Sequence, residues 1–148
     1  MHRPLKGFCI VAAAIVALAS TEVRADLFSK AYAFKPDTTL TIGTELPNGL
    51  RLDSVEFVLP KQDPAQSGIF SGPKAKVTIS NLGTVAAKVG VAIAVTDADG
   101  RLVGVASGGT KIFPLRADRQ IVYTMSFDGV REDLASGTVF RISIEPTP

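Results

Sequence analysis

Apolar and polar residues alternate along five stretches of the chain. The clearest covers residues 89–95, where valine or isoleucine occupies every second position. The same period of two recurs over 55–59, 75–79, 121–127 and 140–144. Successive side chains of a strand point to opposite faces, so this pattern indicates antiparallel strands with one face buried and one face in water.

Turn residues separate these stretches. Asp99-Gly100 predicts a hairpin, because glycine adopts the positive φ that tight turns need. Strands are expected near 39–43, 50–59, 74–81, 87–96, 101–113 with a break at its glycines, 119–127 and 138–145. Seven short strands at this spacing predict an all-β fold, a two-sheet antiparallel β-sandwich. The polar stretch 61–73, rich in proline and glycine, is predicted to cross from one sheet to the other.

The first 25 residues read as a secretory signal peptide. An apolar run of 12 residues, 8–19, follows the basic residues Arg3 and Lys6. A membrane-spanning helix needs about 20 apolar residues, so no integral membrane segment is expected after cleavage. Small residues favour cleavage after Ala25, or alternatively after Ala19. The alanine-rich run favours a bacterial protein, so we expect a periplasmic or secreted product.

Removal of residues 1–25 changes the composition. The remainder has 13 basic and 13 acidic residues and contains no histidine, cysteine or tryptophan. Such a chain has no side chain for disulfides, for thiol or imidazole catalysis, or for zinc and copper sites with soft ligands. Zero net charge also argues against a nucleic-acid partner. We therefore expect no enzymatic activity, no catalytic residue, no metal and no cofactor.

Two motifs could carry chemistry, and each has a simpler interpretation. Asp97-Ala98-Asp99-Gly100 resembles half of a calcium loop, but the further acids and the distal glutamate of such a loop are missing. A turn explains these residues. Ser107 and Lys111 could form a nucleophile pair only if the amine were desolvated, and a lysine beside a polar loop stays solvated.

Four residues are candidate partner contacts. Tyr32 and Phe34 lie in an N-terminal arm, 26–38, which precedes the sandwich domain 39–148 and is expected to form a helical turn or an added edge strand. These aromatics either pack on the sandwich or, if exposed, meet a partner. Arg116 and Arg119 flank a mixed-charge turn that could hold an anionic lipid or sugar, or simply be solvated.

Small residues occupy the expected outer face of the 87–96 strand, at Gly90, Ala92 and Ala94. A solvated face normally carries larger polar residues. This row predicts either that another sheet or a second subunit approaches closely, or that the arm 27–34 covers the strand.

Several of these segments are similar to a known kind of module. The sequence Val-Thr-Ile-Ser-Asn-Leu-Gly at 77–83, the hairpin 95–103, Ile-Phe-Pro-Leu at 112–115 and the strand 121–127 resemble bacterial Ig-like domains of the FxLYD or CARDB type. Thr96 departs from that pattern, since such a hairpin usually carries tyrosine there. The cysteine pair and buried tryptophan of antibody domains are also missing. The resemblance implies an Ig-like sandwich that binds or assembles rather than catalyses.

These observations lead to two functional hypotheses. The first is a non-catalytic, exported Ig-like module that mediates protein–protein interaction or assembly in the bacterial envelope, with another envelope protein or a second copy as its partner. An unpaired edge strand beside an exposed apolar patch would favour it. The alternative is a periplasmic carrier for an apolar or anionic small ligand, which requires an enclosed cavity of roughly 300 Å³ or more.

Overall fold

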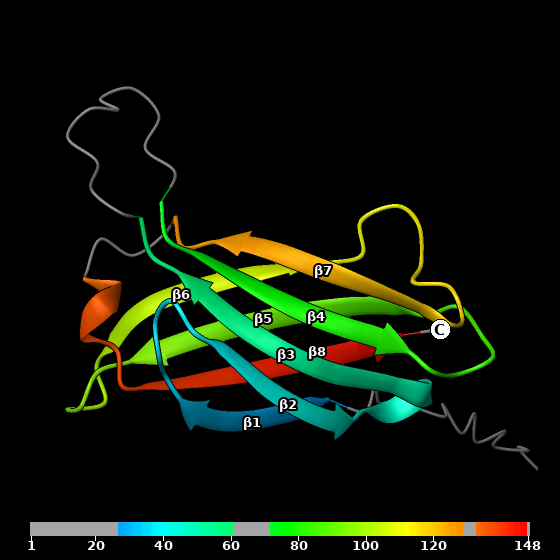
Figure 1. Cartoon of the computed structure of the whole chain (residues 1–148), viewed down its shortest axis with the longest axis horizontal. Helices are drawn as coiled ribbons and strands as arrows, with labels where there is room; N and C mark the ends of the chain where they lie inside the picture. Colours follow the sequence, from blue (N-terminus) through cyan, green and yellow to red (C-terminus); the bar gives the residue numbers. More distant parts are fainter. Residues whose placement is uncertain (1–26, 61–71, 129–132, 148) are drawn as a thin grey trace, which may run out of the picture.

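Two four-stranded antiparallel sheets form the molecule (Figure 1). The computed structural model describes residues 27–60, 72–128 and 133–147. Its strands are β1 (Phe28–Ala33), β2 (Thr39–Glu45), β3 (Leu50–Val58), β4 (Lys74–Asn81), β5 (Lys88–Thr96), β6 (Leu102–Gly109), β7 (Arg119–Ser126) and β8 (Val139–Thr147). Two short 3-10 turns, η1 (Pro47–Gly49) and η2 (Leu134–Ser136), precede β3 and β8.

The strand order defines which strands lie at the sheet edges. Sheet A has the order β1-β8-β5-β6, and sheet B has the order β2-β3-β4-β7. The two sheets pack face to face, so the fold is a β-sandwich, as the alternating pattern predicts. Among the described residues, no helix is long and apolar enough to cross a membrane. The expected signal peptide lies outside the described residues.

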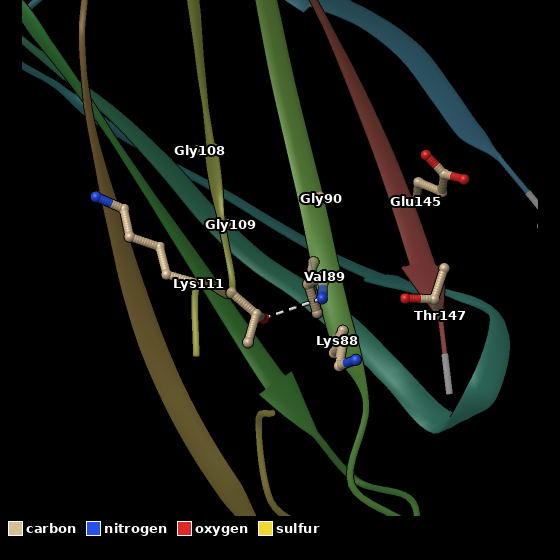
Figure 2. Close-up of a pocket in the computed structure, with 9 residues that line it drawn as sticks. Lys88, Val89, Gly90, Gly108, Gly109, Lys111, Glu145 and Thr147 are labelled. Carbon is tan, nitrogen blue, oxygen red and sulfur yellow. Dashed lines mark hydrogen bonds between the residues drawn. The ribbon is translucent and has the colours of Figure 1, made fainter. Parts of the chain in front are cut away.

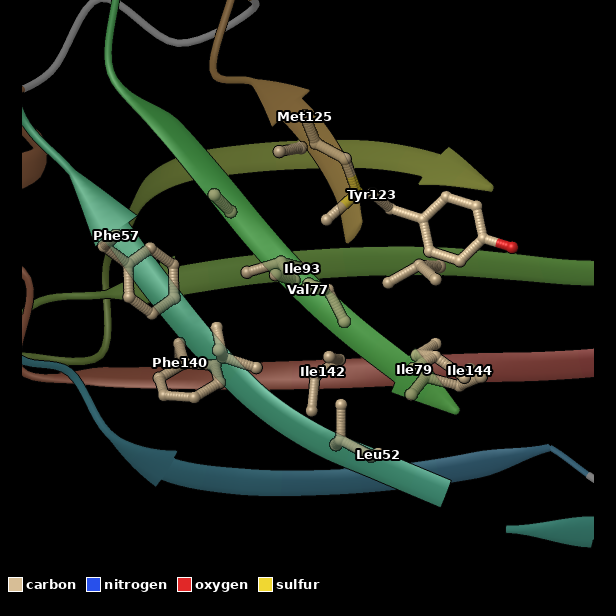
Figure 3. Close-up of a cluster of buried hydrophobic side chains, with 14 of the residues drawn as sticks. Leu52, Phe57, Val77, Ile79, Ile93, Tyr123, Met125, Phe140, Ile142 and Ile144 are labelled. Carbon is tan, nitrogen blue, oxygen red and sulfur yellow. The ribbon is translucent and has the colours of Figure 1, made fainter. Parts of the chain in front are cut away.

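The core lies between the inward faces of the two sheets (Figure 3). Phe57 of β3 meets Phe140 of β8 across the interior, with ring centroids 4.8 Å apart in an edge-to-face geometry. The predicted inward stripe of β5 is buried, and Ile93 is 1% exposed. Burial of these apolar side chains is the main stabilising contribution to such a fold, about 1.5–3 kcal/mol for each large side chain.

The N-terminal arm is an additional strand rather than a separate element. β1 pairs with β8 from Phe28 opposite Ile144 to Ala33 opposite Val139. Of the two expected forms of the arm, the edge strand is therefore the one found. The sandwich has eight described strands, where the pattern predicts seven.

Two expectations are wrong, and one of the two open alternatives for the outer face of β5 is excluded. The connection over 61–73 joins β3 and β4, which are neighbours in sheet B, so it does not cross between the sheets. The strand expected over 101–113 ends at Gly109, and residues 110–113 belong to the following loop. The arm does not cover β5: it lies beyond β8, and Gly90 and Ala92 on the outer face of β5 are exposed.

Strands β6 and β7 lie side by side although they belong to different sheets. Two glycines of β6 permit this approach. A Cβ at Gly108 would lie 2.6 Å from Cγ of Met125, and a Cβ at Gly104 would lie 3.0 Å from the Phe127 ring. Side chains from sheet B therefore reach directly to the β6 backbone.

Candidate functional site

The loop between β6 and β7 presents two large apolar side chains to solvent. Ile112 is 79% exposed and Phe113 is 81% exposed. In Figure 1 this loop, drawn in yellow, projects from the side of the sandwich on which β6 and β7 lie. Adjacent large apolar residues with this exposure are typical of interaction sites.

The base of this loop is firmly held. Leu115 is buried and exchanges two backbone hydrogen bonds with Ala87, at 3.0 and 2.8 Å. The side-chain amide of the fully buried Asn81 donates to the carbonyl oxygens of Leu115 and Val85, both at 2.9 Å. The loop tip is thus presented by a fixed base.

Strand β7 is an edge of sheet B with little protection against further pairing. It pairs with β4 in continuous register over all eight of its residues. Residues 120–127 contain no charged residue and no proline, and Val122 is 51% exposed. By contrast, the opposite edge strand, β2, is interrupted by a bulge near Gly43, whose φ is 63°. Bulges and charges normally protect edges from pairing with other chains.

We call the outer edge of β7 together with Ile112 and Phe113 the β7 edge surface. Its charges lie at its two ends. Arg119 begins β7 and Arg116 stands in the preceding loop, whereas Asp128 follows the end of the strand, and all three are exposed. Asp118, also exposed, lies between the two arginines, so one end of the surface carries mixed charge and the other end carries the single carboxylate of Asp128.

The four sequence-predicted contacts separate into two groups. Arg116 and Arg119 belong to the β7 edge surface. Phe34 is buried, and its ring lies 4.6 Å from that of Phe57 between centroids. Tyr32 is half-buried and stacks on Phe140 at 5.5 Å. The two aromatics pack on the sandwich near the β1 edge, so the structure does not bring them together with the arginines.

A polar cluster occupies the outer face of sheet B. The carboxylate of Asp53 accepts hydrogen bonds from Arg51 at 2.6 Å, Ser80 at 2.5 Å and Gln120 at 3.0 Å. Burial raises the pKa of Asp53, but the hydrogen bonds from Ser80, Arg51 and Gln120 outweigh that effect and hold the pKa below its ordinary value. The Ser80 hydroxyl donates to the Asp53 carboxylate, which also accepts hydrogen bonds from Arg51 and Gln120. The cluster joins three strands of the sheet.

The segment Asp97–Gly100, which resembles half of a calcium loop, forms a turn in which the Asp97 carboxylate already has partners. The Asp97 carboxylate accepts the backbone N–H groups of Arg101 and Asp99, both at 2.9 Å, and pairs with the Arg101 guanidinium at 3.1 Å. The Arg101 backbone hydrogen bond is the main reason that the pKa of Asp97 is lowered. Within the described ranges, no three histidine, cysteine, aspartate or glutamate side chains gather as metal ligands.

Two hollows open on the surface beside β6. The first, of about 400 Å³, lies over Gly90 and Gly109, with Lys88, Lys111 and Glu145 around it (Figure 2). Next to it, the Thr110 hydroxyl accepts the Val89 N–H at 3.0 Å and contacts the Tyr123 hydroxyl at 2.9 Å. The second, of about 390 Å³, runs between β6 and β7 and ends at Asp128.

Sequence reasoning missed Ile112, Phe113 and Val122. The apolar pair was assigned to a strand, which places at least one of its side chains in the core. The signal that could have found it is Pro114, which directly follows the pair and limits pairing there. Val122 faces outward in a strand whose other outward residues are polar. A single exposed apolar residue is common on protein surfaces and does not by itself indicate a binding site.

Comparison with protein-family models, curated proteins and solved structures finds no match to this chain. The fold and the site geometry therefore define the class: a two-sheet, antiparallel β-sandwich with an exposed apolar loop beside an open edge strand.

Proposed function

We propose that this chain is a non-catalytic, exported, Ig-like module that binds an envelope protein through the β7 edge surface. The observation that carries the proposal is the position of Ile112 and Phe113 beside an edge strand that has no bulge and that, after Arg119 at its start, has no charged residue and no proline. An extended segment of a partner can add to such an edge by main-chain hydrogen bonds, while apolar contacts supply selectivity.

The order of the strands supports the Ig-like part of the proposal. In a constant-type Ig domain, strands A, B, E and D form one sheet and strands C, F and G form the other. Here β3, β4 and β7 take the places of A, B and E, and β5 and β8 take those of C and F. β1 occupies the place of G beside β8, so the N-terminal strand stands where the last strand of an Ig domain usually lies.

The non-catalytic part of the proposal draws on two polar clusters whose carboxylates already have partners. The oxygens of Asp53 and Asp97 are engaged by neighbours within the fold. Export is supported by residues 1–25 of the sequence, which have the basic, apolar and polar segments of a signal peptide in that order.

The carrier alternative receives less support. It needs a cavity between the sheets, whereas Phe57, Phe140 and the other interior side chains meet one another there. The two described hollows are open to solvent beside β6. Docking of a macromolecule at a surface is therefore the better-supported function.

The proposal is tested by placing a charge on the β7 edge. The full-length chain is expressed in an exporting bacterial host, and the envelope proteins that it retains are compared with those retained by Val122→Lys. Thr41→Lys, on the exposed and bulged opposite edge of sheet B, is the matched control. We expect Val122→Lys to reduce partner retention at least tenfold and Thr41→Lys to leave it unchanged. Equal retention by all three folded proteins would overturn the proposal.

A further inference from the structure

We infer that the end of the sandwich formed by the loops 82–87 and 110–118 docks on the surface of an anionic lipid bilayer. Four exposed apolar side chains of these loops enter the bilayer interface, and the basic side chains around them contact lipid headgroups. The inference goes beyond the proposed function, because it adds a lipid contact at this end and leaves the main-chain groups of β7 free for the envelope protein.

The exposed apolar side chains gather on two loops. Leu82 and Val85, both more than half exposed, lie in the loop between β4 and β5, and Ile112 and Phe113 lie in the loop between β6 and β7. Both loops lie at the end of the sandwich at which β8 ends (Figure 1). We call these four residues the apolar end surface. Ile112 and Phe113 belong to both named surfaces, since their loop leads into the start of β7.

Hydrogen bonds at the loop bases hold the two loops side by side. Ala87, at the end of the first loop, exchanges two backbone hydrogen bonds with Leu115 of the second. The Asn81 side chain donates to the carbonyl oxygens of Val85 and Leu115, one in each loop. The Asp118 N–H donates to the Asn81 carbonyl oxygen at 2.9 Å. The fold therefore presents the apolar side chains together before they bind, which lowers the entropic cost of docking.

The charges around the apolar end surface suit an anionic bilayer. The two loops and the first residue of the strand after each contain four basic side chains and one acidic side chain, all exposed: Lys88, Lys111, Arg116, Arg119 and Asp118. Glu45 and Glu145 lie on strands at the same end, so the described residues there keep a net positive charge. Each lysine or arginine near an anionic membrane strengthens binding about fivefold.

The opposite end of the sandwich carries the opposite charge. Its described connecting segments hold two basic residues, Lys35 and Arg101, against five acidic residues: Asp37, Asp97, Asp99, Asp128 and Asp133. Arg101 is already paired with Asp97 and Asp99, both at 3.1 Å. An anionic surface therefore attracts the apolar end and repels the acidic end, which orients the molecule with its loops toward the bilayer.

The shape of the apolar end surface favours lipid over protein. Ile112 and Phe113 have about four-fifths of their surface exposed, so they protrude from the fold. A protein partner would need a matching pocket for each protruding side chain, whereas the bilayer interface deforms around them. Binding to that interface strengthens with buried apolar area and with attraction to anionic lipids, and this end of the sandwich supplies both.

A single tryptophan tests insertion into lipid. The chain contains no tryptophan, so Phe113→Trp introduces a unique reporter. The full-length variant is expressed in an exporting host, and the exported protein is mixed with vesicles of phosphatidylcholine, with or without phosphatidylglycerol. With the anionic vesicles we expect a blue shift of emission and quenching by brominated acyl chains, and at least tenfold weaker binding to the neutral vesicles. Leu102→Trp, exposed at the opposite end, is the control and should show neither change.

Matched substitutions separate the apolar contribution from the charged one. Val85→Ser is expected to weaken binding to the anionic vesicles about fivefold, whereas Leu102→Ser should leave it unchanged. Lys111→Gln is also expected to weaken binding about fivefold, whereas Lys35→Gln, exposed at the acidic end, should not. Co-sedimentation with vesicles over a range of lipid concentrations measures the affinities.

The outcomes separate this inference from the proposed function. Absence of a Phe113→Trp shift with anionic vesicles would overturn the inference, as would equal vesicle binding by Val85→Ser and the wild type. A shift that needs an added envelope protein, or that grows with protein concentration alone, would show that a protein covers this surface and would also overturn it. Val122→Lys should lose the envelope protein and keep vesicle binding, so either idea can fail while the other stands.

Discussion

Gly109 lies directly against the carbonyl oxygen of Val89, and a Cβ at position 109 would overlap that oxygen. The φ of Gly109 is 142°, a value that residues with a side chain rarely adopt. At this point β6 ends and Thr110 donates its N–H to the same carbonyl group, at 2.8 Å. The loop with the exposed apolar tip thus begins at a position that only glycine fits.

Gly109→Ala is therefore expected to destabilise the fold through both strain and overlap. We expect a loss of about 3 kcal/mol in the free energy of unfolding, measured by urea denaturation. Gly100→Ala is the matched control, because Gly100 also has positive φ but open space around its Cβ position. It should cost only about 1 kcal/mol. Equal losses for both variants would show that the contact with Val89 has no effect.

Asn81 is expected to be the most important polar residue for the loop base. Asn81→Ala removes two donors and one acceptor from backbone groups of Val85, Leu115 and Gly83, of which the bond to Leu115 is buried and the other two are part-buried. An unpaired buried group costs about 1–3 kcal/mol, and water can reach the groups of Val85 and Gly83, so we expect a loss of about 2 kcal/mol in the free energy of unfolding. Hydrogen exchange should also accelerate at the Leu115 amide. Asn48→Gly, at an exposed position with φ of 60°, should leave stability within about 0.5 kcal/mol.

The Asp53 cluster predicts a pH dependence of stability. The pKa of Asp53 is lowered in the folded protein, so its contribution is present above the unfolded pKa of about 3.8 and is lost as the pH falls through the folded pKa. Asp53→Asn should cost about 1 kcal/mol at pH 6, and the difference from wild type should shrink below pH 4. Urea denaturation at several pH values measures this. A constant difference down to pH 2 would contradict the assignment.

The Tyr32 hydroxyl offers a substitution that removes an unfavourable group. Its oxygen is buried and makes no hydrogen bond among the described residues, although the ring stacks on Phe140. Tyr32→Phe keeps the ring and removes the unpaired oxygen, so the free energy of unfolding should rise by up to about 1 kcal/mol. Tyr32→Ala should lower it by about 3 kcal/mol. A loss in Tyr32→Phe would indicate that the oxygen has a partner in solution.

The periodicity of the sequence predicted most of the strands because burial on one face imposes a period of two. The alternation of Val91, Ile93 and Val95 sufficed to place β5 and its inward face. β1 was harder, because Lys30 interrupts a short apolar pattern and the strand forms on the open edge of β8. That edge exists only in the folded protein, so the local sequence of the arm does not encode the pairing.

The candidate site was predicted only in part. Arg116 and Arg119 were candidates because charge clusters are visible in a sequence, and their role as partner contacts stays a prediction. Ile112 and Phe113 were missed because apolar residues are expected inside, and their exposure depends on the pairing of Leu115 with Ala87. That pairing is a contact between distant loops, which local alternation does not encode.

The pairing of β1 with β8 has a consequence for how the chain folds. The hydroxyl of Ser29 lies 3.1 Å from that of Ser143, a contact between residues 114 positions apart. Contacts so distant in sequence slow folding, because a long loop must close before they form. In a chain made N-terminus first, sheet A therefore stays incomplete until β8 is available, because β8 is the strand that joins β1 to β5.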